Sequence, residues 1–251
     1  MNELKTTFSS GCSSCGLQRI CFPTGLMRTD IMRLDSIVER TPKVTKGQYL
    51  YKAGQTFETL FAIKAGAVKA FNITQQGEEQ ILGFYLPGDV IGMDGLQDLM
   101  HQCNVVALES TTVCLLPFDQ LERLALQIPA LNHQLLCLMS RGLNDGRIHS
   151  EILSKRNADQ RVAYFVWYLS RRFLSRGYKH TEFRFGVLHR EVAMFLGLTP
   201  ETFSRILSKL MELNIVAWRR KDIQILDMAA LARLADEKVL SLPDVLDVKQ
   251  A

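Results

Sequence analysis

Three cysteines near the N-terminus have the spacing of a metal-binding loop. Cys12, Cys15 and Cys21 follow the pattern C-x2-C-x5-C, with Gly and Ser among the residues between them. Thiolates this close in sequence can wrap one polynuclear centre, and iron–sulfur cubanes and structural zinc sites both take four ligands. The spacing does not distinguish iron–sulfur from zinc, and incidental free thiols are the alternative. The pattern leaves three candidates open for a fourth ligand: Cys103, Cys114 and Cys137.

A second stretch, residues 188–210, predicts two short helices joined by a sharp turn. Gly197 suits the left-handed position that ends a helix, Thr199 is a good N-cap, and Pro200 fits the first helical position. The apolar residues at helical spacing are Val192, Phe195, Leu196, Phe203, Ile206, Leu207 and Leu210. This pattern predicts a helix-turn-helix, a motif whose second helix enters the major groove of DNA.

The outer face of that second helix has side chains suited to base recognition. Arg205 can bond bidentately to guanine, Glu201 can accept a hydrogen bond from cytosine N4, and Ser204 can contact a base or a phosphate. The alternative is an ordinary helical hairpin with a solvated polar face. The residues around it, however, favour nucleic acid.

A basic hairpin follows the two helices. Residues 215–218 and 223–226 are short apolar runs, and between them lie Arg219, Arg220, Lys221 and Asp222. The pattern predicts a wing with a basic tip that meets the phosphate backbone. Residues 156–226 contain 13 Lys+Arg and 6 Asp+Glu, a net charge of +7, and the rest of the chain, 17 against 20, is −3. A basic C-terminal region is the electrostatic pattern expected of nucleic-acid binding.

The sequence has neither the features of a membrane protein nor a recognisable catalytic motif, and an enzyme would leave the E-x-x-S-R helix and the basic wing unexplained. The 251-residue chain has no run of ~18 apolar residues, and its N-terminus has no apolar core typical of a secretion signal. A cytoplasmic location is therefore expected, where cysteines serve metal or redox chemistry more often than disulfides. No pair of residues resembles a catalytic base and nucleophile. The histidines have no metal-ligand spacing.

The elements that must position these residues change character along the chain. Short strand-like runs between glycine-containing turns fill residues 40–117 and predict a small antiparallel barrel or roll. Helical periodicity then begins near Phe118, with a short helix from Asp119 and a long one from Pro129 to about Lys155. The expected fold class is α+β, with a β-roll, a long helix and a winged helix-turn-helix.

The long helix has two apolar seams at coiled-coil spacing. One starts with Leu131, Leu135 and Leu138. The other includes Leu136, Met139, Leu143, Gly146 and Leu153. A helix with two adjacent apolar stripes can pack one stripe against its own roll and the other against the same helix of a second copy. We therefore expect a homodimer. A plain amphipathic core helix is the alternative, and the glycines would weaken a seam.

In this order of elements the chain resembles the CRP/FNR superfamily of bacterial transcription regulators, and most closely its FNR branch of oxygen-responsive iron–sulfur regulators. Four segments carry the resemblance: the cysteine loop followed by Phe22-Pro23, the hairpin Gln75–Phe84, the strand Thr112–Phe118, and the E-x-x-S-R sequence of Glu201–Arg205. The resemblance implies a cyclic-nucleotide-binding-like roll and makes Cys114 the fourth ligand beside Cys12, Cys15 and Cys21.

The resemblance also implies a mechanism and partners. The four thiolates would hold a 4Fe-4S cluster that favours the dimer, and oxygen would destroy the cluster and inactivate the protein. The dimer would bind an inverted TTGAT-like repeat in double-stranded DNA. The residues expected at DNA are Glu201, Ser204, Arg205, Thr199, Thr202, Lys209, Arg219, Arg220 and Lys221. The residues expected to contact RNA polymerase are Gln76, Gly77, Glu78 and Glu79.

Other signals remain possible on the same scaffold, namely zinc or thiol redox chemistry, or a cyclic nucleotide. The cyclic-nucleotide branch fits less well, because no arginine occurs from Lys69 to Glu122 to bind a cyclic phosphate. The expected domains are a cysteine-rich segment (1–27), the β-roll (28–118), the dimerisation helix region (119–156), the winged helix-turn-helix (157–236) and a tail (237–251).

Overall fold

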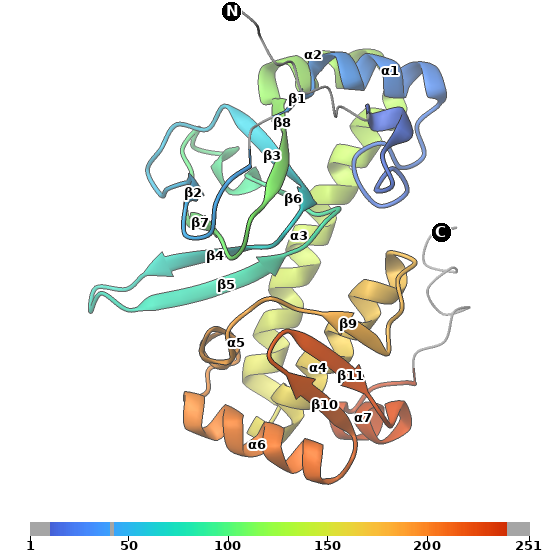
Figure 1. Cartoon of the computed structure of the whole chain (residues 1–251). Helices are drawn as coiled ribbons and strands as arrows, with labels where there is room; N and C mark the ends of the chain where they lie inside the picture. The colour runs from blue at the N-terminus through green and yellow to red at the C-terminus, as the bar shows by residue number, and fades with distance from the viewer. Residues whose placement is uncertain (1–10, 41–42, 240–251) are drawn as a thin grey trace, which may run out of the picture. The chain divides into compact units, whose positions relative to one another are not determined.

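The computed structural model describes residues 11–40 and 43–239. The first ten residues and most of the predicted tail therefore lie outside the described part. The chain divides into two compact units, Met1–Gly142 and Leu143–Ala251 (Figure 1). Within the described ranges, no helix is both long enough and apolar enough to cross a membrane.

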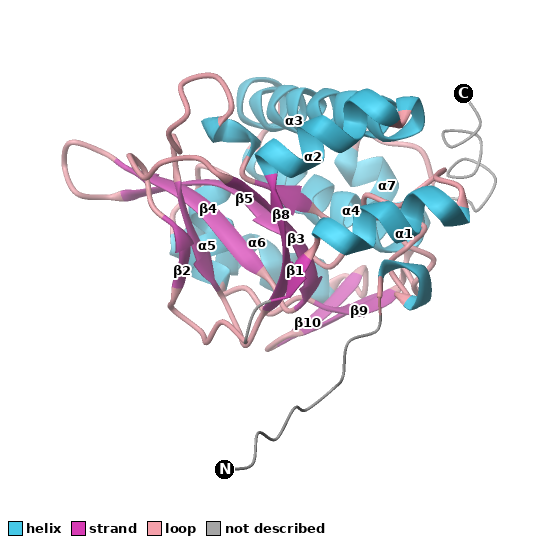
Figure 2. Ribbon diagram, turned by 90° about the horizontal axis from the view of Figure 1, so that it is seen from above, coloured by secondary structure: helices cyan, strands magenta, loops and turns pink. Residues whose placement is uncertain are grey.

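The first unit contains the predicted β-roll, built from two four-stranded antiparallel sheets (Figure 2). One sheet has the order β1-β8-β3-β6 and the other β2-β7-β4-β5. The strands are β1 (Glu39–Arg40), β2 (Tyr49–Tyr51), β3 (Thr59–Ala65), β4 (Val68–Ile73), β5 (Glu79–Tyr85), β6 (Val90–Ile91), β7 (Asn104–Ala107) and β8 (Thr112–Pro117). Their short runs with Gly at the corners are the pattern from which the sequence predicts a roll. Gly66, with a φ of 87°, shows why glycine is needed, because a Cβ there would lie 2.5 Å from Thr111 Oγ1.

Helices cover one end of the roll and share its core. They are α1 (Arg28–Ile37), α2 (Phe118–Gln127) and the start of α3 (Pro129–Lys155), and two 3-10 helices, η1 (Cys12–Ser14) and η2 (Met93–Gly95), complete the unit. The core beneath them contains Leu34 of α1, Leu60 of β3, Leu121 of α2 and Leu131 of α3, each fully buried. Cys12, Cys21 and Cys114 pack against this core. Packing of the cysteine loop and packing of α3 are therefore linked.

The long helix α3 has 27 residues, about 40 Å at the usual rise. Leu131 and Leu135 of its first seam are buried in the core of the first unit. Its last turns, from Leu143 onward, belong to the second unit.

The second unit is a small helical domain with a three-stranded sheet. Its elements are the end of α3, α4 (Ala158–Ser175), β9 (Glu182–Arg184), α5 (His189–Phe195), α6 (Pro200–Glu212), β10 (Val216–Arg219), β11 (Asp222–Ile225) and α7 (Met228–Ala235). The sheet order is β10-β11-β9. Phe165, Phe185 and Phe203 are buried in its core, and Trp218 packs edge-on against both Phe185 and Phe203.

Candidate metal centre and DNA interface

The cysteine loop is held by short-range backbone turns and two apolar anchors. The Cys15 N–H donates to the Cys12 carbonyl over 3.3 Å, and the Cys21 N–H donates to the Leu17 carbonyl over 2.9 Å. Leu17 and Phe22 are buried, so the loop is fixed to the roll between its cysteines as well as after them. Small residues between Cys12 and Cys15 allow the chain to wind this tightly.

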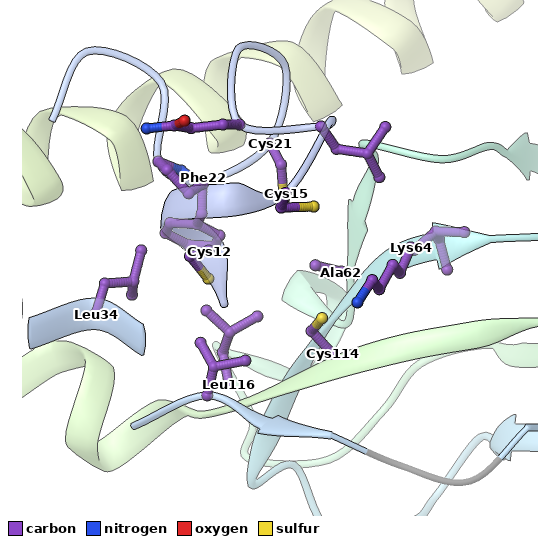
Figure 3. Close-up of a pocket in the computed structure, with 14 residues that line it drawn as sticks. Cys12, Cys15, Cys21, Phe22, Leu34, Ala62, Lys64, Cys114 and Leu116 are labelled. Carbon is purple, nitrogen blue, oxygen red and sulfur yellow. The ribbon is translucent and has the colours of Figure 1, made fainter. Parts of the chain in front are cut away.

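All four predicted ligands line one pocket (Figure 3). Cys12, Cys15 and Cys21 come from the loop, and Cys114 comes from β8, on the other side of the pocket. The other two cysteines do not line it: the Cys103 thiol lies 3.4 Å from Asp94 Oδ2, and the Cys137 thiol lies 3.4 Å from His133 Nε2. Most of the remaining pocket wall is apolar and includes Leu17, Phe22, Leu34, Val38, Ala62, Ile63 and Leu116.

The surroundings of three of these thiols oppose their ionisation. Burial raises the pKa of Cys12 to about 12, and the neighbouring Asp35 carboxylate acts in the same direction. Burial also raises the pKa of Cys21 to about 12 and raises that of Cys114, where the Lys64 cation opposes it. These three thiols are therefore protonated at neutral pH unless a cation binds them, so their ligation must release protons.

A carboxylate that no sequence pattern singles out holds the loop in place. Asp35, on α1, accepts a hydrogen bond from the Cys12 N–H over 2.9 Å and one from the Arg40 guanidinium over 2.6 Å. Arg40, on β1, is the register partner of Cys114 on β8. The Asp35 side chain thus connects the loop that carries three cysteines to the strand beside the fourth. Helix α1 itself was not predicted, so no sequence signal pointed to this residue.

The donor set is compatible in kind with a cluster that its four thiolates surround. One zinc ion with Zn–S bonds of about 2.3 Å brings its sulfur atoms to within about 3.8 Å of one another. Within the described part of the chain, no three His, Cys, Asp or Glu side chains are grouped so that they could hold one ion. In a 4Fe-4S cluster each thiolate binds a different iron, so the ligands surround a larger body. Four thiols around one largely apolar pocket match that requirement.

The predicted helix-turn-helix is formed by α5 and α6. Gly197 has a φ of 62°, and the Leu198 N–H donates to the Ala193 carbonyl over 2.9 Å, which closes the first helix. Thr199 caps α6 by accepting from the Thr202 N–H over 3.2 Å, and Pro200 begins it. The inner face consists of Phe203, Ile206, Leu207 and Leu210, all buried. These are the positions that helical spacing indicates.

The predicted base-reading side chains lie on the opposite face. Glu201, Ser204 and Arg205 are exposed, whereas Thr202 is half-buried beside the cap. Hydrogen bonds from its own backbone N–H and from Thr199 hold the pKa of the Glu201 carboxyl below its ordinary value, so it is an acceptor at neutral pH. Lys209 is exposed but forms an ion pair with Asp159 of α4 over 2.9 Å.

The wing has the predicted composition and a tight connection. Arg219 on β10 faces Asp222 on β11, so only two residues, Arg220 and Lys221, form the turn. Arg220 takes the left-handed conformation with a φ of 56°, and its carbonyl accepts a hydrogen bond from Trp218 Nε1 over 3.3 Å. The side chains of Arg219, Arg220 and Lys221 are all exposed.

The remaining predicted contact residues are at the surface. Gln76, Gly77 and Glu78 form the exposed tip of the β4–β5 hairpin, and Glu79 forms an ion pair with Lys69. On α3, exposed fractions are 54% for Leu136, 36% for Met139 and 78% for Leu143. Gly146 is also exposed, and Leu153 is half-buried. The second seam of α3 is thus uncovered over its first half, whereas Leu153 contributes to the second unit.

The chain is similar over most of its length to known regulators. The family model described as a cyclic nucleotide-binding domain matches residues 42–127, and that described as a Crp-like helix-turn-helix domain matches residues 160–234. The transcriptional activator protein Anr of Pseudomonas protegens is 38% identical over 94% of this chain and 97% of its own length. The fumarate and nitrate reduction regulatory protein of Escherichia coli K12 is 39% identical over 89% of this chain and 90% of its own length. The structure of FixK2 from Bradyrhizobium japonicum superposes with a TM-score of 0.72 and 25% identity, over 81% of this chain and 100% of FixK2.

Proposed function

Because this chain belongs to the CRP/FNR family of transcription regulators, in the branch of Anr and the fumarate and nitrate reduction regulators, we propose that it is an oxygen-responsive regulator of anaerobic metabolism. It would act mainly as an activator, in the cytoplasm, and not as an enzyme. One observation carries the oxygen response: four cysteines from two separate parts of the sequence line a single pocket in a chain that also has a Crp-like helix-turn-helix domain.

The ligands of the proposed 4Fe-4S cluster are Cys12, Cys15, Cys21 and Cys114. When bound, the cluster would supply an oxygen-labile link between the N-terminal loop and strand β8. The protein's own residues contribute the apolar wall, which limits access of water, and Asp35, which holds the loop close to β8. Each thiol must give up its proton to become a ligand, so loading should be favoured at higher pH.

The packing of the first unit supports a route from this loop to the dimer. Cys12, Cys21 and Cys114 pack against the core that contains Leu131 and Leu135 of α3. A change in how tightly the loop is held therefore alters the packing of the first turns of that helix. The exposed second seam on the same helix, Leu136, Met139 and Leu143, would pack against α3 of a second copy.

The proposed dimer reads DNA with two copies of α6. A two-fold pair places its recognition helices about 34 Å apart, over two half-sites of an inverted TTGAT-like repeat. Glu201, Ser204 and Arg205 would contact base edges. Thr199, Thr202 and Lys209, with Arg219, Arg220 and Lys221 of the wing, would contact the phosphates. The hairpin tip of Gln76, Gly77, Glu78 and Glu79 would face RNA polymerase.

The test is to purify the protein without oxygen and to measure its visible spectrum, iron, sulfide and DNA affinity before and after exposure to air. We expect a brown protein with about four irons and four sulfides per chain that bleaches in air and then loses affinity for the repeat. Cys114→Ser should lose the colour, and Cys137→Ser, a cysteine outside the pocket, should keep it. A colourless protein with one zinc per chain would contradict the oxygen mechanism.

A further inference from the structure

The guanidinium of Arg161 joins three elements of the second unit through three main-chain carbonyls. Its Nη2 donates to the Leu153 carbonyl of α3 over 2.7 Å, and its Nε donates to the Arg156 carbonyl over 3.0 Å. Its Nη1 donates to the Leu196 carbonyl over 3.1 Å. Arg161 itself is on the first turns of α4, so each nitrogen of one side chain binds a different part of the chain.

These carbonyls are groups that need a partner. Leu153 lies in the last turn of α3, where carbonyls have no intrahelical donor, and Leu196 is the C-cap of α5. Negative partial charge collects at both helix ends, and a guanidinium is planar, always charged and able to bind several acceptors at once. Arginine therefore satisfies both helix ends at the same time, which a lysine with one nitrogen could not do in the same geometry.

A second side chain holds the same turn from α3. The His149 ring stacks on the Phe195 ring with centroids 4.2 Å apart and an interplanar angle of 4°. Its Nε2 lies 2.8 Å from the Phe195 carbonyl oxygen, which requires the proton on Nε2. Gly197, two residues after Phe195, has no side chain, and a Cβ there would lie 3.3 Å from Leu153 and 3.4 Å from Arg161. The turn between α5 and α6 is thus in close contact with the end of α3.

We propose that Arg161 is a positioning residue for DNA reading: it fixes the turn of the helix-turn-helix to the end of the dimerisation helix. Residues 156 and 157 join α3 to α4, and with Arg161 in place this junction cannot bend without breaking hydrogen bonds on both sides. The direction of α6 then follows the direction of α3, so the dimer accepts only one separation of half-sites. This inference rests on the proposed function, because it requires that α3 pairs two copies and that α6 reads DNA.

Half-site spacing tests this directly. Inserting one base pair between the half-sites moves them apart by about 3.4 Å and rotates them by about 34°. We would measure the affinity of protein purified without oxygen for three duplexes: the preferred inverted repeat, the same repeat with one added base pair, and a duplex with a single half-site. Wild type should lose about tenfold or more on the lengthened repeat. Arg161→Lys should lose less than about threefold, while its affinity for the single half-site stays within about twofold of wild type.

The matched control is Arg171→Lys, the same change on the same helix, at an exposed arginine whose guanidinium lies 5.8 Å from the Trp167 ring centroid. It should keep the spacing preference of wild type. A purely structural role for Arg161 would lower the melting temperature and weaken binding to all three duplexes equally. That result, or an unchanged spacing preference in Arg161→Lys, would overturn the inference.

Hydrogen exchange without DNA separates this inference from the proposed function. Arg161→Lys should speed exchange in peptides covering 149–157 and 193–200 together, compared with wild type and Arg171→Lys. If wild type binds none of the duplexes, the proposed function fails, yet the exchange result still decides whether Arg161 joins the two regions. Unchanged exchange in both peptides would refute the joining role.

Discussion

Asp35 offers a sharp test of how the cysteine loop is held before any metal binds. Replacing it with alanine removes the acceptor for the Cys12 N–H and the partner of Arg40. A hydrogen bond to a charged group contributes about 1.5–3 kcal/mol, and a partly exposed ion pair about 0–1 kcal/mol. We therefore expect loss of about 2–3 kcal/mol of local stability, which corresponds to about 30- to 150-fold faster opening of the loop.

Hydrogen exchange of the metal-free protein is the assay, followed in a peptide covering residues 12–21. Asp35→Asn keeps an acceptor oxygen but no charge, so its exchange rate should fall between those of wild type and Asp35→Ala. Asp30→Asn, on the same helix, is the control and should exchange at the wild-type rate. Although burial raises the pKa of Asp35, the hydrogen bonds from Cys12 and the charge of Arg40 lower it overall, so the effect should be fully present at pH 7. Equal rates in Asp35→Ala and wild type would refute the role of Asp35 in holding the loop.

Three further predictions concern the second unit and the dimer seam. Arg205→Ala should cost about 1–3 kcal/mol per half-site at one guanine, measured by binding to the repeat and to a copy with that base changed; equal loss on both would make Arg205 a phosphate contact. Gly146→Leu should increase the dimer fraction of the metal-free protein measured by sedimentation, because a Cβ at Gly146 meets nothing within 4 Å and Leu is the better helix former. An unchanged dimer fraction would count against the seam. Burial lowers the pKa of His189, whose Nε2 has no hydrogen-bond partner among the described residues. The neutral ring therefore stabilises the fold above the unfolded pKa of about 6.5, and this stability is lost as pH falls through the lower folded pKa. His189→Gln should reduce this dependence of the melting temperature on pH, and an unaltered pH dependence would exclude His189 as its source.

Helix α6, which we propose reads bases, could be predicted because everything that specifies it is local. Gly197, Thr199 and Pro200 set its start, and the buried set from Phe203 to Leu210 recurs at helical spacing. The roll was predicted from short runs between glycine turns for the same reason. Strands β1 and β6 were not, because two residues have no period to detect. Helix α1 buries only Ile31 and Leu34, which leaves too weak an apolar pattern to notice.

The supporting residues could not be predicted, because their roles depend on contacts between distant parts of the chain. Asp35 acts on a backbone N–H 23 residues away. Arg161 binds a carbonyl 35 residues away, and its sequence neighbourhood is that of any amphipathic helix. Main-chain acceptors have no residue type, so no motif can encode them. The sequence therefore predicts the groups that we propose contact metal or DNA, whereas only the fold identifies those that position them.

The middle of α3 would explain why the proposed dimer is conditional. All seven residues from Arg141 to Arg147 are exposed, and two of them, Gly142 and Gly146, are poor helix formers that each cost about 1 kcal/mol relative to alanine. Its side chains bury no apolar surface within their own chain and make only polar contacts there, such as the hydrogen bond from Tyr168 to Asp145 and the ion pair of Arg147 with Glu151. We therefore propose that its helical state is most favourable when a second copy covers it. A marginal seam gives a dimerisation equilibrium that a few kcal/mol can reverse. Because the cysteine loop shares its core with the first turns of α3, we propose that repacking of this loop shifts the equilibrium.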